Sequence, residues 1–380
     1  IKLWSSTQAP TAVQRIAAKV LGLPMNLVEV EVTRLGGAFG GKEDQATPWA
    51  VMAAMAAQRT GRPVRLTLNR HEDMCFTGKR HPYSSDFKLG LKSDGTIVAY
   101  EVHLWQNAGA AADLSPAILE RSLFHATGAY FVPNARIHAA SCRTNLIPFT
   151  AFRGFGAPQS MFVMEAAIDR AAEVTGIPRS EIQARNLLDE GDAFPYGMRV
   201  ERSQARRSFH EASDRFGLSA LEDEIAAHNT TSRLSKRGVA AMPVCFGISF
   251  TNAMLNQAGA LVHVYTDGSV SVSTGAIEMG QGVTAKILAV AAATLGLPQN
   301  RIRIESTTTR TIANTSPTAA SSGADMNGRA TEIACRAISN RLLAVAAAAL
   351  DAEPHRLGIS AGILTIDGEP TKLEWNELVW

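Results

Sequence analysis

The chain contains an internal repeat, and this repeat constrains the fold more than any other feature of the sequence. RIAAKVLGLPMNLVEVEV at 15–32 and AVAAATLGLPQNRIRIES at 289–306 share an Ala-rich segment, the sequence LGLP-x-N and an alternating apolar stretch. A Gly before Pro ends a helix, and V-x-V or I-x-I alternation begins a strand with one buried face. Both copies therefore predict a helix, a turn and a strand in the same order.

The segments that flank the two copies also correspond. Each predicted helix follows a polar turn with a glutamine, and each strand leads to a loop of small residues: SSTQ (5–8) and GGAFGGKE (36–43) in one copy, EMGQG (278–282) and NTSPTAASSGAD (314–325) in the other. Such a duplication often frames one ligand between two halves. The small-residue loops precede helices, the first with Thr47 as N-cap and Pro48 at N1, so their backbone N–H groups can bind an anion. The alternative is a duplicated packing motif without a ligand.

The remaining segments predict a mixture of hairpins and helices. Residues 86–107 and 260–275 alternate on both sides of an Asp-Gly turn, which is typical of hairpins. Residues 158–188 are mostly helical with a break at GIP (176–178), and a charged helical region covers about 201–228. A polar boundary at 229–237 separates the halves, so we expect domains at 1–230 and 231–380. Without regular strand–helix alternation, the fold class is α+β.

The composition excludes several classes of function. With 37 Lys and Arg against 35 Asp and Glu the formal net charge is +2, so nucleic acid and anionic membranes are not indicated as partners. No apolar run reaches the roughly 18 residues of a membrane span. The four cysteines, Cys75, Cys142, Cys245 and Cys335, form no C-x-x-C pair, which argues against an iron–sulfur cluster, a zinc site or disulfides in this chain. We expect buried thiols in a reducing cytoplasm.

The loop TRLGGAFGGKED (33–44) has the spacing of a phosphate-binding loop at Gly36, Gly41 and Lys42. A loop of that kind needs Ser or Thr after the lysine to coordinate Mg²⁺. Glu43 follows instead, and its carboxylate would repel phosphates. A nucleoside triphosphate is therefore not the ligand of this loop.

A second glycine-rich loop, TAFRGFGAPQ (150–159), carries Arg153 between two phenylalanines. A guanidinium offers a bidentate fork to a phosphate or carboxylate. Taken singly, Arg153 is more often a structural ion pair, Phe39 a core residue and Gln281 a turn residue. No G-x-S-x-G or H-E-x-x-H sequence occurs, so neither a serine hydrolase nor a first-row metal site is indicated.

In combination, these motifs resemble the molybdenum-cofactor-binding part of the xanthine dehydrogenase and aldehyde oxidase family. The resemblance rests on GGAFGGKE, AFRGFGAPQ, EMGQG and TSPTAASSGADMNG in this order, and LERSLFHATGAY and FGISFTNAMLNQAGALVHVYTDGSV extend it over essentially the whole chain. It implies duplicated α+β cofactor-binding domains with mixed sheets and flanking helices. It also implies a molybdenum–molybdopterin cofactor, whose metal takes its sulfur ligands from the pterin and not from protein cysteines.

The resemblance implies roles for individual residues. Gln8, the backbone around Phe39, and Arg153 would lie near the molybdenum, through the cofactor rather than by side-chain ligation. Further cofactor contacts would come from Gly37, Gly40, Met279, Gln281, Ala320 and Ser321. The implied reaction is oxidative hydroxylation, with 2Fe–2S clusters, FAD and NAD as electron acceptor on other segments or subunits of an oligomeric enzyme.

Four residues bear on the substrate that the resemblance implies. Glu43 and Arg121 stand where the xanthine-oxidising members carry Glu and Arg, and where aldehyde oxidases have apolar residues. Glu43 can accept N–H hydrogen bonds from a purine such as hypoxanthine or xanthine, and Arg121 can stabilise negative charge on a ring oxygen as urate forms. Phe155 is an aromatic wall for a flat ring. Met254 stands where the family often has a second Phe, and can pack on a ring face.

Two departures from the family pattern bear on completeness and activity. Gly323 stands where a Ser is common, and the GEP at 368–370 follows Asp367 in IDGEPTK, which predicts a hairpin turn and not the family's catalytic G-E-P-P motif. The chain begins at Ile1 and ends inside LEWNELVW, which has a helical pattern. We therefore expect a segment of a longer enzyme, with the catalytic Glu beyond Trp380, that is inactive alone. An aldehyde or N-heterocycle oxidoreductase and a non-catalytic scaffold are the alternatives.

Overall fold

The computed structural model describes residues 1–380, which form two compact units. The first unit combines residues 1–78 with 248–380, and the second is made of residues 79–247. The compact units thus differ from the linear division into 1–230 and 231–380, because both ends of the chain fold into the same unit. The expected domain boundaries, 1–230 and 231–380, remain a prediction.

The first unit is built from short sheets and helices. Its strands are β1 (Lys2–Trp4), β2 (Glu29–Val32), β6 (Ala260–Val264), β7 (Val270–Thr274), β8 (Ile302–Ile304), β9 (Thr307–Thr308), β10 (Leu357–Ser360), β11 (Ile363–Ile366) and β12 (Glu369–Glu374). Its helices are α1 (Pro10–Leu21), α2 (Thr47–Thr60), α3 (Arg70–Phe76), α9 (Val283–Leu295), α10 (Gly323–Leu350) and α11 (Trp375–Val379), with 3₁₀ turns η1 (Met25–Leu27), η2 (Ala253–Leu255), η3 (Gln299–Arg301) and η4 (Pro354–Arg356).

Both copies of the repeat form a β–α–β arrangement. β1 lies parallel to β2 with α1 between them in sequence, and β7 lies parallel to β8 with α9 between them. The helices end at Gly22 and Gly296, whose φ angles are 67° and 68°, and η1 and η3 lead into the strands. The predicted order of helix, LGLP turn and strand is confirmed in both copies.

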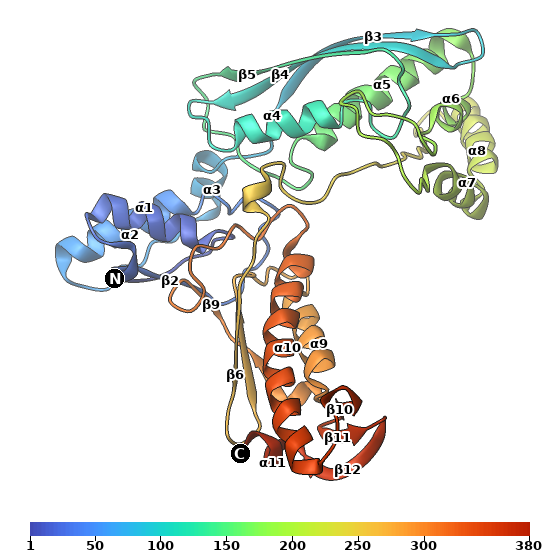
Figure 1. Ribbon diagram of the computed structural model, residues 1–380. Coiled ribbons are helices and arrows are strands. Elements are labelled where there is room, and N and C mark those ends of the chain that lie inside the picture. The colour runs from blue at the N-terminus through green and yellow to red at the C-terminus, as the bar shows by residue number, and fades with distance from the viewer. The chain divides into compact units, whose positions relative to one another are not determined.

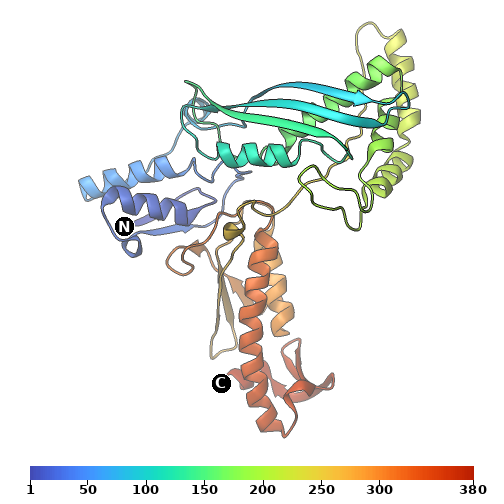
Figure 2. The same cartoon turned by 45° about the horizontal axis from the view of Figure 1, so that its top comes forward.

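The two copies meet through β2, which also pairs antiparallel with β9 of the second copy. In the second copy α9 and α10 lie side by side, as both views show (Figures 1 and 2). Apolar residues of α9 such as Ile287 and Leu295 pack with Val272 of β7 and Cys335 of α10. The predicted hairpin at 260–275 is confirmed as β6 and β7, and IDGEPTK is the turn between β11 and β12.

Two details of the first unit correct the sequence analysis. Helix α2 begins at Thr47 with Ala46 in the cap position and no side-chain cap, so the assignment of Thr47 as N-cap was wrong by one residue. Helix α10 is 28 residues long, and one 18-residue window of it is apolar enough to cross a membrane by length and composition. A single helix of this kind is weak evidence, and α10 contributes the buried residues Cys335, Ala346 and Ala347 to apolar clusters of the unit.

The second unit is a three-stranded sheet with helices. The strands are β3 (Tyr83–Leu91), β4 (Ile97–Gly109) and β5 (Ala135–Arg143), and the helices are α4 (Ser115–Phe124), α5 (Ala157–Thr175), α6 (Arg179–Asn186), α7 (Ala205–Phe216) and α8 (Leu218–Thr231). β4 is central, antiparallel to β3 and parallel to β5. Helices α4 and α5 lie against one face of the sheet (Figure 2), where Tyr100 and Leu104 pack with Met164 and Ile168.

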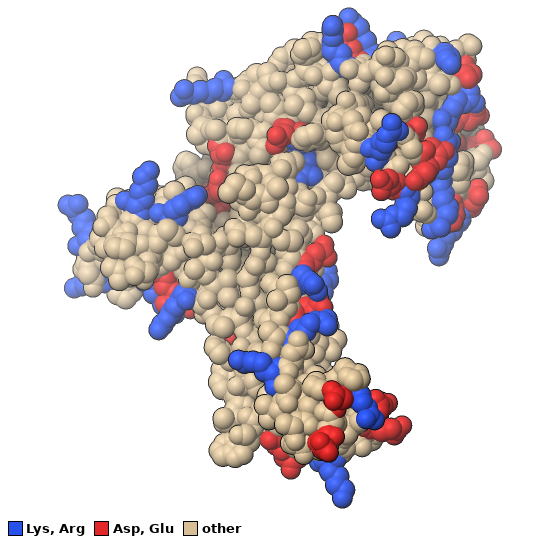
Figure 3. Space-filling view, viewed as in Figure 1, with Lys and Arg blue, Asp and Glu red and all other residues tan.

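The predicted elements of the second unit are confirmed, with one division added. Residues 86–107 form the β3–β4 hairpin, and α5 and α6 flank the break at GIP. The charged region is two helices, α7 and α8, separated by Gly217 at φ 60°. The arginines of these two helices lie on α7, whereas α8 carries only acidic charged residues, and side chains of both signs lie side by side on the face shown in Figure 3. All four cysteines are free, but Cys75 and Cys142 are exposed, so the expectation of buried thiols was wrong for those two.

Candidate functional site

The loop between β2 and α2 has a strained backbone that presents an aromatic side chain. Phe39 adopts φ 55° between Gly37 at 104° and Gly40 at 97°, and its side chain is 59% exposed. A Cβ on Gly37 would lie 3.1 Å from the Phe39 ring. Left-handed conformations in non-glycine residues cost energy and concentrate at functional sites. The glycines are therefore required by this loop conformation.

Gln8 links this loop to the small-residue loop of the second copy. Its side-chain Nε2 donates to the carbonyl oxygen of Thr318 at 2.9 Å, and its Oε1 accepts from the N–H of Gly40 at 2.9 Å. The backbone of Gln8 adds a bond to Lys42 O at 2.8 Å and one from Thr318 N at 3.0 Å. Because this amide is buried, each of these bonds satisfies groups that water cannot reach. Gln8 therefore fixes the two loops against each other.

The turn before α9 is organised by its own side chains. Glu278 accepts hydrogen bonds from the N–H groups of Gly280, Gly282 and Thr284. Burial alone would raise the pKa of Glu278, but these three N–H groups outweigh it and the pKa is lowered. The N–H groups at this helix start are thus already bound by Glu278 and are not available to an anionic ligand. Gln281 is exposed, and its amide bonds back to Ile277 O and Met279 N.

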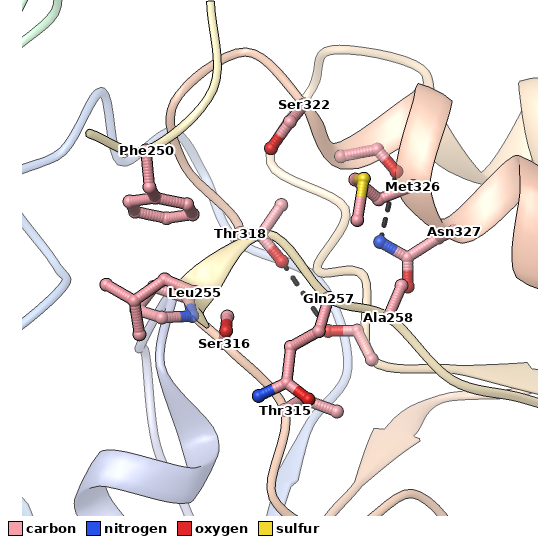
Figure 4. A pocket seen from close by; sticks show the side chains of 13 residues that line it. Phe250, Leu255, Gln257, Ala258, Thr315, Ser316, Thr318, Ser322, Met326 and Asn327 are labelled. Carbon is pink, nitrogen blue, oxygen red and sulfur yellow. Dashed lines mark hydrogen bonds between the residues drawn. The ribbon is translucent and has the colours of Figure 1, made fainter. Parts of the chain in front are cut away.

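The small-residue loop before α10 adopts two successive left-handed residues, Ala320 at φ 54° and Ser321 at φ 57°. The N–H of Ser249 donates to Ala320 O at 2.9 Å. Beside this loop lies a cavity of about 20 Å³, lined among others by Phe250, Thr318 and Asn327 (Figure 4). Two buried polar atoms of its lining, Ser316 Oγ and Asn327 Oδ1, have no hydrogen-bond partner. The cavity therefore offers polar groups to a ligand atom or a water.

The cavity includes an aromatic residue that sequence reasoning missed. Phe250 lines it, four residues before Met254, while the Met254 side chain is 84% exposed. The sequence GISFTNAM (247–254), which was used to single out Met254, also contains Phe250 and could have indicated it. Met254 stays a predicted substrate contact, and Phe250 is an additional candidate for stacking on a flat ring.

In the second unit, the AFRGFGAPQ loop repeats the backbone conformation of the first loop. Phe155 and Gly156 have φ 51° and 100°, as Phe39 and Gly40 have 55° and 97°. Arg153 is exposed, and Arg80 donates to its carbonyl oxygen at 2.8 Å. The same arrangement of Phe and Gly therefore occurs in each unit.

This second loop is attached directly to helix α4. A Cβ on Gly156 would lie 2.2 Å from the carbonyl oxygen of Ile118, and Ser122 Oγ donates to Gly156 O at 3.0 Å. Tyr83 contributes its hydroxyl, 2.8 Å from Ser122 Oγ, and burial raises the pKa of Tyr83 to about 12 despite that hydrogen bond. The loop of Arg153 and Phe155 is therefore fixed to the helix that carries Arg121.

The two predicted substrate residues are both buried ionisable groups. Arg121 is 6% exposed on α4, and burial lowers its pKa, an effect that nearby Glu120 partly offsets. Glu43 is 5% exposed at the end of the first loop, where its N–H donates to Gly40 O. Charged side chains are seldom buried to this extent unless other groups compensate the charge.

Each unit brings together its own predicted residues. The first unit assembles three loops around Gln8: the loop of Gly37, Phe39, Gly40 and Glu43, the turn of Met279 and Gln281, and the loop of Ala320 and Ser321. The second unit joins Arg153 and Phe155 to Arg121 through α4. Across residues 1–380, no group of three or more His, Cys, Asp and Glu side chains could hold a metal ion.

Comparison with known proteins identifies what these loops belong to. The family model for a molybdopterin cofactor-binding domain matches residues 1–187, and a second model of the same description matches residues 211–380. The xanthine dehydrogenase/oxidase of Mus musculus is 45% identical over 90% of this chain and 26% of its own length. The nicotinate hydroxylase hnxS of Emericella nidulans is 41% identical over 90% of this chain and 25% of its own length. The chain thus spans about a quarter of the length of these relatives.

A solved structure supports the same fold. Quinoline 2-oxidoreductase from Pseudomonas putida 86 has a TM-score of 0.86 and 24% sequence identity, and the match covers 100% of this chain and 50% of that one. The chain belongs to the molybdopterin cofactor-binding domains. Specifically, it is a molybdenum-binding segment of the xanthine dehydrogenase and aldehyde oxidase family, as the resemblance of its motifs predicted.

The residues present fit such a cofactor. The glycine-rich and small-residue loops contain left-handed residues, and the cavity beside the loop at 314–325 is lined by two buried polar atoms without hydrogen-bond partners, Ser316 Oγ and Asn327 Oδ1. A pterin with its phosphate needs several hydrogen-bond partners, and such polar groups are present beside these loops.

Proposed function

We propose that this chain is the cofactor-binding part of a xanthine dehydrogenase-type enzyme that hydroxylates hypoxanthine and xanthine to urate. The observation that carries the proposal is the burial of two charged residues, Glu43 within the first glycine–phenylalanine loop and Arg121 on the helix to which the second such loop is bonded through Ser122. The runs FGISF and ALVHVYTDGSV, around Ile248 and His263, also resemble xanthine dehydrogenase.

The residues proposed to contact the cofactor are Gln8, Gly37, Phe39, Gly40, Arg153, Met279, Gln281, Ala320 and Ser321. When bound, it would supply the oxidising centre that receives two electrons as an electron-poor carbon is hydroxylated. The chain's own residues would orient the purine. Glu43 would accept its N–H groups, Arg121 would stabilise negative charge on a ring oxygen, and Phe155 would pack on the ring, with Phe250 or Met254 as further apolar contacts.

The rest of the electron path would lie elsewhere in the enzyme. We assign 2Fe–2S clusters, FAD and the transfer to NAD to other segments or subunits, and the catalytic base to a Glu outside these residues. We also propose that the enzyme is oligomeric and cytoplasmic. The four free thiols are consistent with a reducing compartment.

A substitution experiment on the complete enzyme tests the substrate assignment. Replacing Arg121 by Met and Glu43 by Val should lower kcat/KM for xanthine by roughly 10²-fold or more each, because each removes one charged contact that is strongest in the transition state. Molybdenum content, measured by elemental analysis, should stay at the wild-type level. Undiminished xanthine turnover in both variants would contradict the assignment.

A second candidate, hydroxylation of another N-heterocycle, is favoured by the similarity to a nicotinate hydroxylase. A preference for nicotinate over xanthine in the wild-type enzyme would support this alternative. An aldehyde oxidase is less favoured, because an aliphatic aldehyde has no ring N–H groups for Glu43 and no ring oxygen for Arg121 to bind. If the isolated chain serves only as a scaffold, it should bind no stoichiometric molybdenum and turn over none of these substrates.

A further inference from the structure

Arg121 and the residue that ends helix α4, His125, both bind Gly247. The Nη1 of Arg121 donates to the carbonyl oxygen of Gly247, and the N–H of Gly247 donates to Nε2 of His125 at 3.1 Å. The N–H and the C=O of one peptide residue are thus both bound by α4. All three residues lie in the second unit.

The hydrogen bonds of His125 determine its tautomer. Nδ1 lies 2.9 Å from the carbonyl oxygen of Arg121, one turn earlier on the helix. A carbonyl oxygen only accepts and a backbone N–H only donates, so Nδ1 carries the proton and Nε2 is the acceptor for Gly247. Burial lowers the pKa of His125 against the effect of the Arg121 carbonyl, and the charge of Arg121 lowers it further. The ring is therefore neutral and oriented.

Phe246 packs against both side chains. Its ring centroid lies 5.2 Å from that of His125 and 5.4 Å from the guanidinium carbon of Arg121. Gly247 has little room for a side chain, because a Cβ would lie 3.3 Å from Nη1 of Arg121. The guanidinium thus occupies a defined position between α4 and residues 246–247.

We infer that His125 is a positioning residue for Arg121 in substrate recognition. By binding the N–H of Gly247, His125 presents the carbonyl oxygen that anchors the guanidinium. The inference rests on the proposed role of Arg121 toward a purine. Loss of the acceptor at Nε2 would remove one of the two hydrogen bonds that hold Gly247 to α4, so the carbonyl oxygen that binds Arg121 would be less well fixed.

Two substitutions of His125 separate its two hydrogen bonds. Gln can place an amide oxygen near the position of Nε2 and so keep an acceptor for Gly247, whereas Asn reaches only the position of Nδ1. In the complete enzyme, His125→Asn should lower kcat/KM for xanthine roughly three- to tenfold, the effect of one lost hydrogen bond. His125→Gln should recover most of that loss. His138→Asn, at an exposed histidine of β5 in the same unit, is the matched control and should have no effect.

A double-mutant cycle with Arg121→Met tests whether His125 acts through Arg121. In the Arg121→Met background, His125→Asn should cause no further loss of xanthine turnover, and turnover of an aliphatic aldehyde should be unaffected by His125→Asn alone. Gly247→Ala provides an independent perturbation of the same anchor, and it should lower kcat/KM for xanthine even if His125→Asn fails to fold.

The outcomes distinguish the inference from the function on which it rests. If Arg121→Met leaves xanthine turnover unchanged, the proposed function fails. If Arg121→Met lowers turnover but His125→Asn and Gly247→Ala do not, or if the losses from His125→Asn and Arg121→Met are additive, then His125 does not position Arg121 and the inference is overturned.

Discussion

The two copies of the repeat share a helix, a turn and a strand, yet their glutamines behave differently. Gln8 is buried, and its amide bonds across to the loop of the other copy at Thr318. Gln281, in the corresponding turn, is exposed, and its amide bonds within its own turn. The same residue at the same place in the repeat therefore stabilises the assembly in one copy and stays accessible in the other. Duplication preserved the scaffold, while the contacts of each turn diverged.

The largest difference between the copies is expected at the glycines that end their helices. Gly22 and Gly296 have almost the same φ, but a Cβ on Gly22 meets nothing within 4 Å, whereas one on Gly296 would lie 2.0 Å from Ile359 O. Gly22→Ala should cost about 1 kcal/mol for the left-handed conformation alone. Gly296→Ala should cost more than about 3 kcal/mol, because backbone must also move. Urea unfolding gives the free energy of unfolding of both variants, and an equal decrease in the two would contradict this expectation.

The second largest difference in stability is expected between substitutions of Gln8 and Gln281. Gln8→Ala leaves the N–H of Gly40 and the carbonyl of Thr318 without their partner, and we expect a loss of about 2–4 kcal/mol in the free energy of unfolding. Gln281→Ala, the matched control, should change stability by less than about 0.5 kcal/mol because the side chain is exposed. Chemical denaturation gives both values. A larger loss from Gln281→Ala would reverse the comparison.

A smaller loss of stability is expected from substitution of Thr318, whose carbonyl oxygen binds Gln8. Its Oγ1 accepts from the N–H of Ile277 at 2.9 Å, so that the loop before α10 also binds the turn before α9. Thr318→Val keeps the shape but removes this acceptor, and should destabilise the chain by about 1–3 kcal/mol. Thr318→Ser keeps the hydroxyl and is the control. If both substitutions cost the same in thermal unfolding, the methyl group rather than the hydrogen bond is responsible.

The smallest effect is a pH dependence confined to the second copy. Helix α9 begins with Glu278 binding three N–H groups, whereas α1 has no side-chain cap. The folded pKa of Glu278 lies below its usual 4.5, so this carboxylate adds stability above pH about 4.5, and the contribution is lost as pH falls through the folded pKa. Glu278→Gln should cost about 1 kcal/mol at pH 7. The difference from wild type in the free energy of unfolding should shrink below pH 4.5, and a constant difference would argue against this role.

The local structure was largely predictable from the sequence because its signals are short-range. The LGLP turns, the Asp-Gly hairpins and the IDGEPTK turn each follow from residues within a few positions of one another. A helix after the small-residue loop at 314–325 was predicted, and α10 begins there at Gly323, but its length of 28 residues was not predicted.

The contacts of the site were less predictable because they join distant segments. No local pattern shows that Gln8 binds Thr318, or that Arg121 and His125 bind Gly247. The motifs predicted which loops form the site, whereas the hydrogen-bond partners of their residues became known only from the structure. Glu278 shows the limit of a motif, since EMGQG alone does not indicate that its own carboxylate binds the N–H groups of the turn.

The substrate preference of the complete, molybdenum-loaded enzyme is the most direct test of the account. We predict that kcat/KM for xanthine exceeds that for nicotinate and for an aliphatic aldehyde by roughly 10²-fold or more, because a site built to bond the purine's polar groups leaves them unpaired with other substrates. A ratio near or below one would contradict the role of Glu43 and Arg121 in purine recognition, and with it the proposed function.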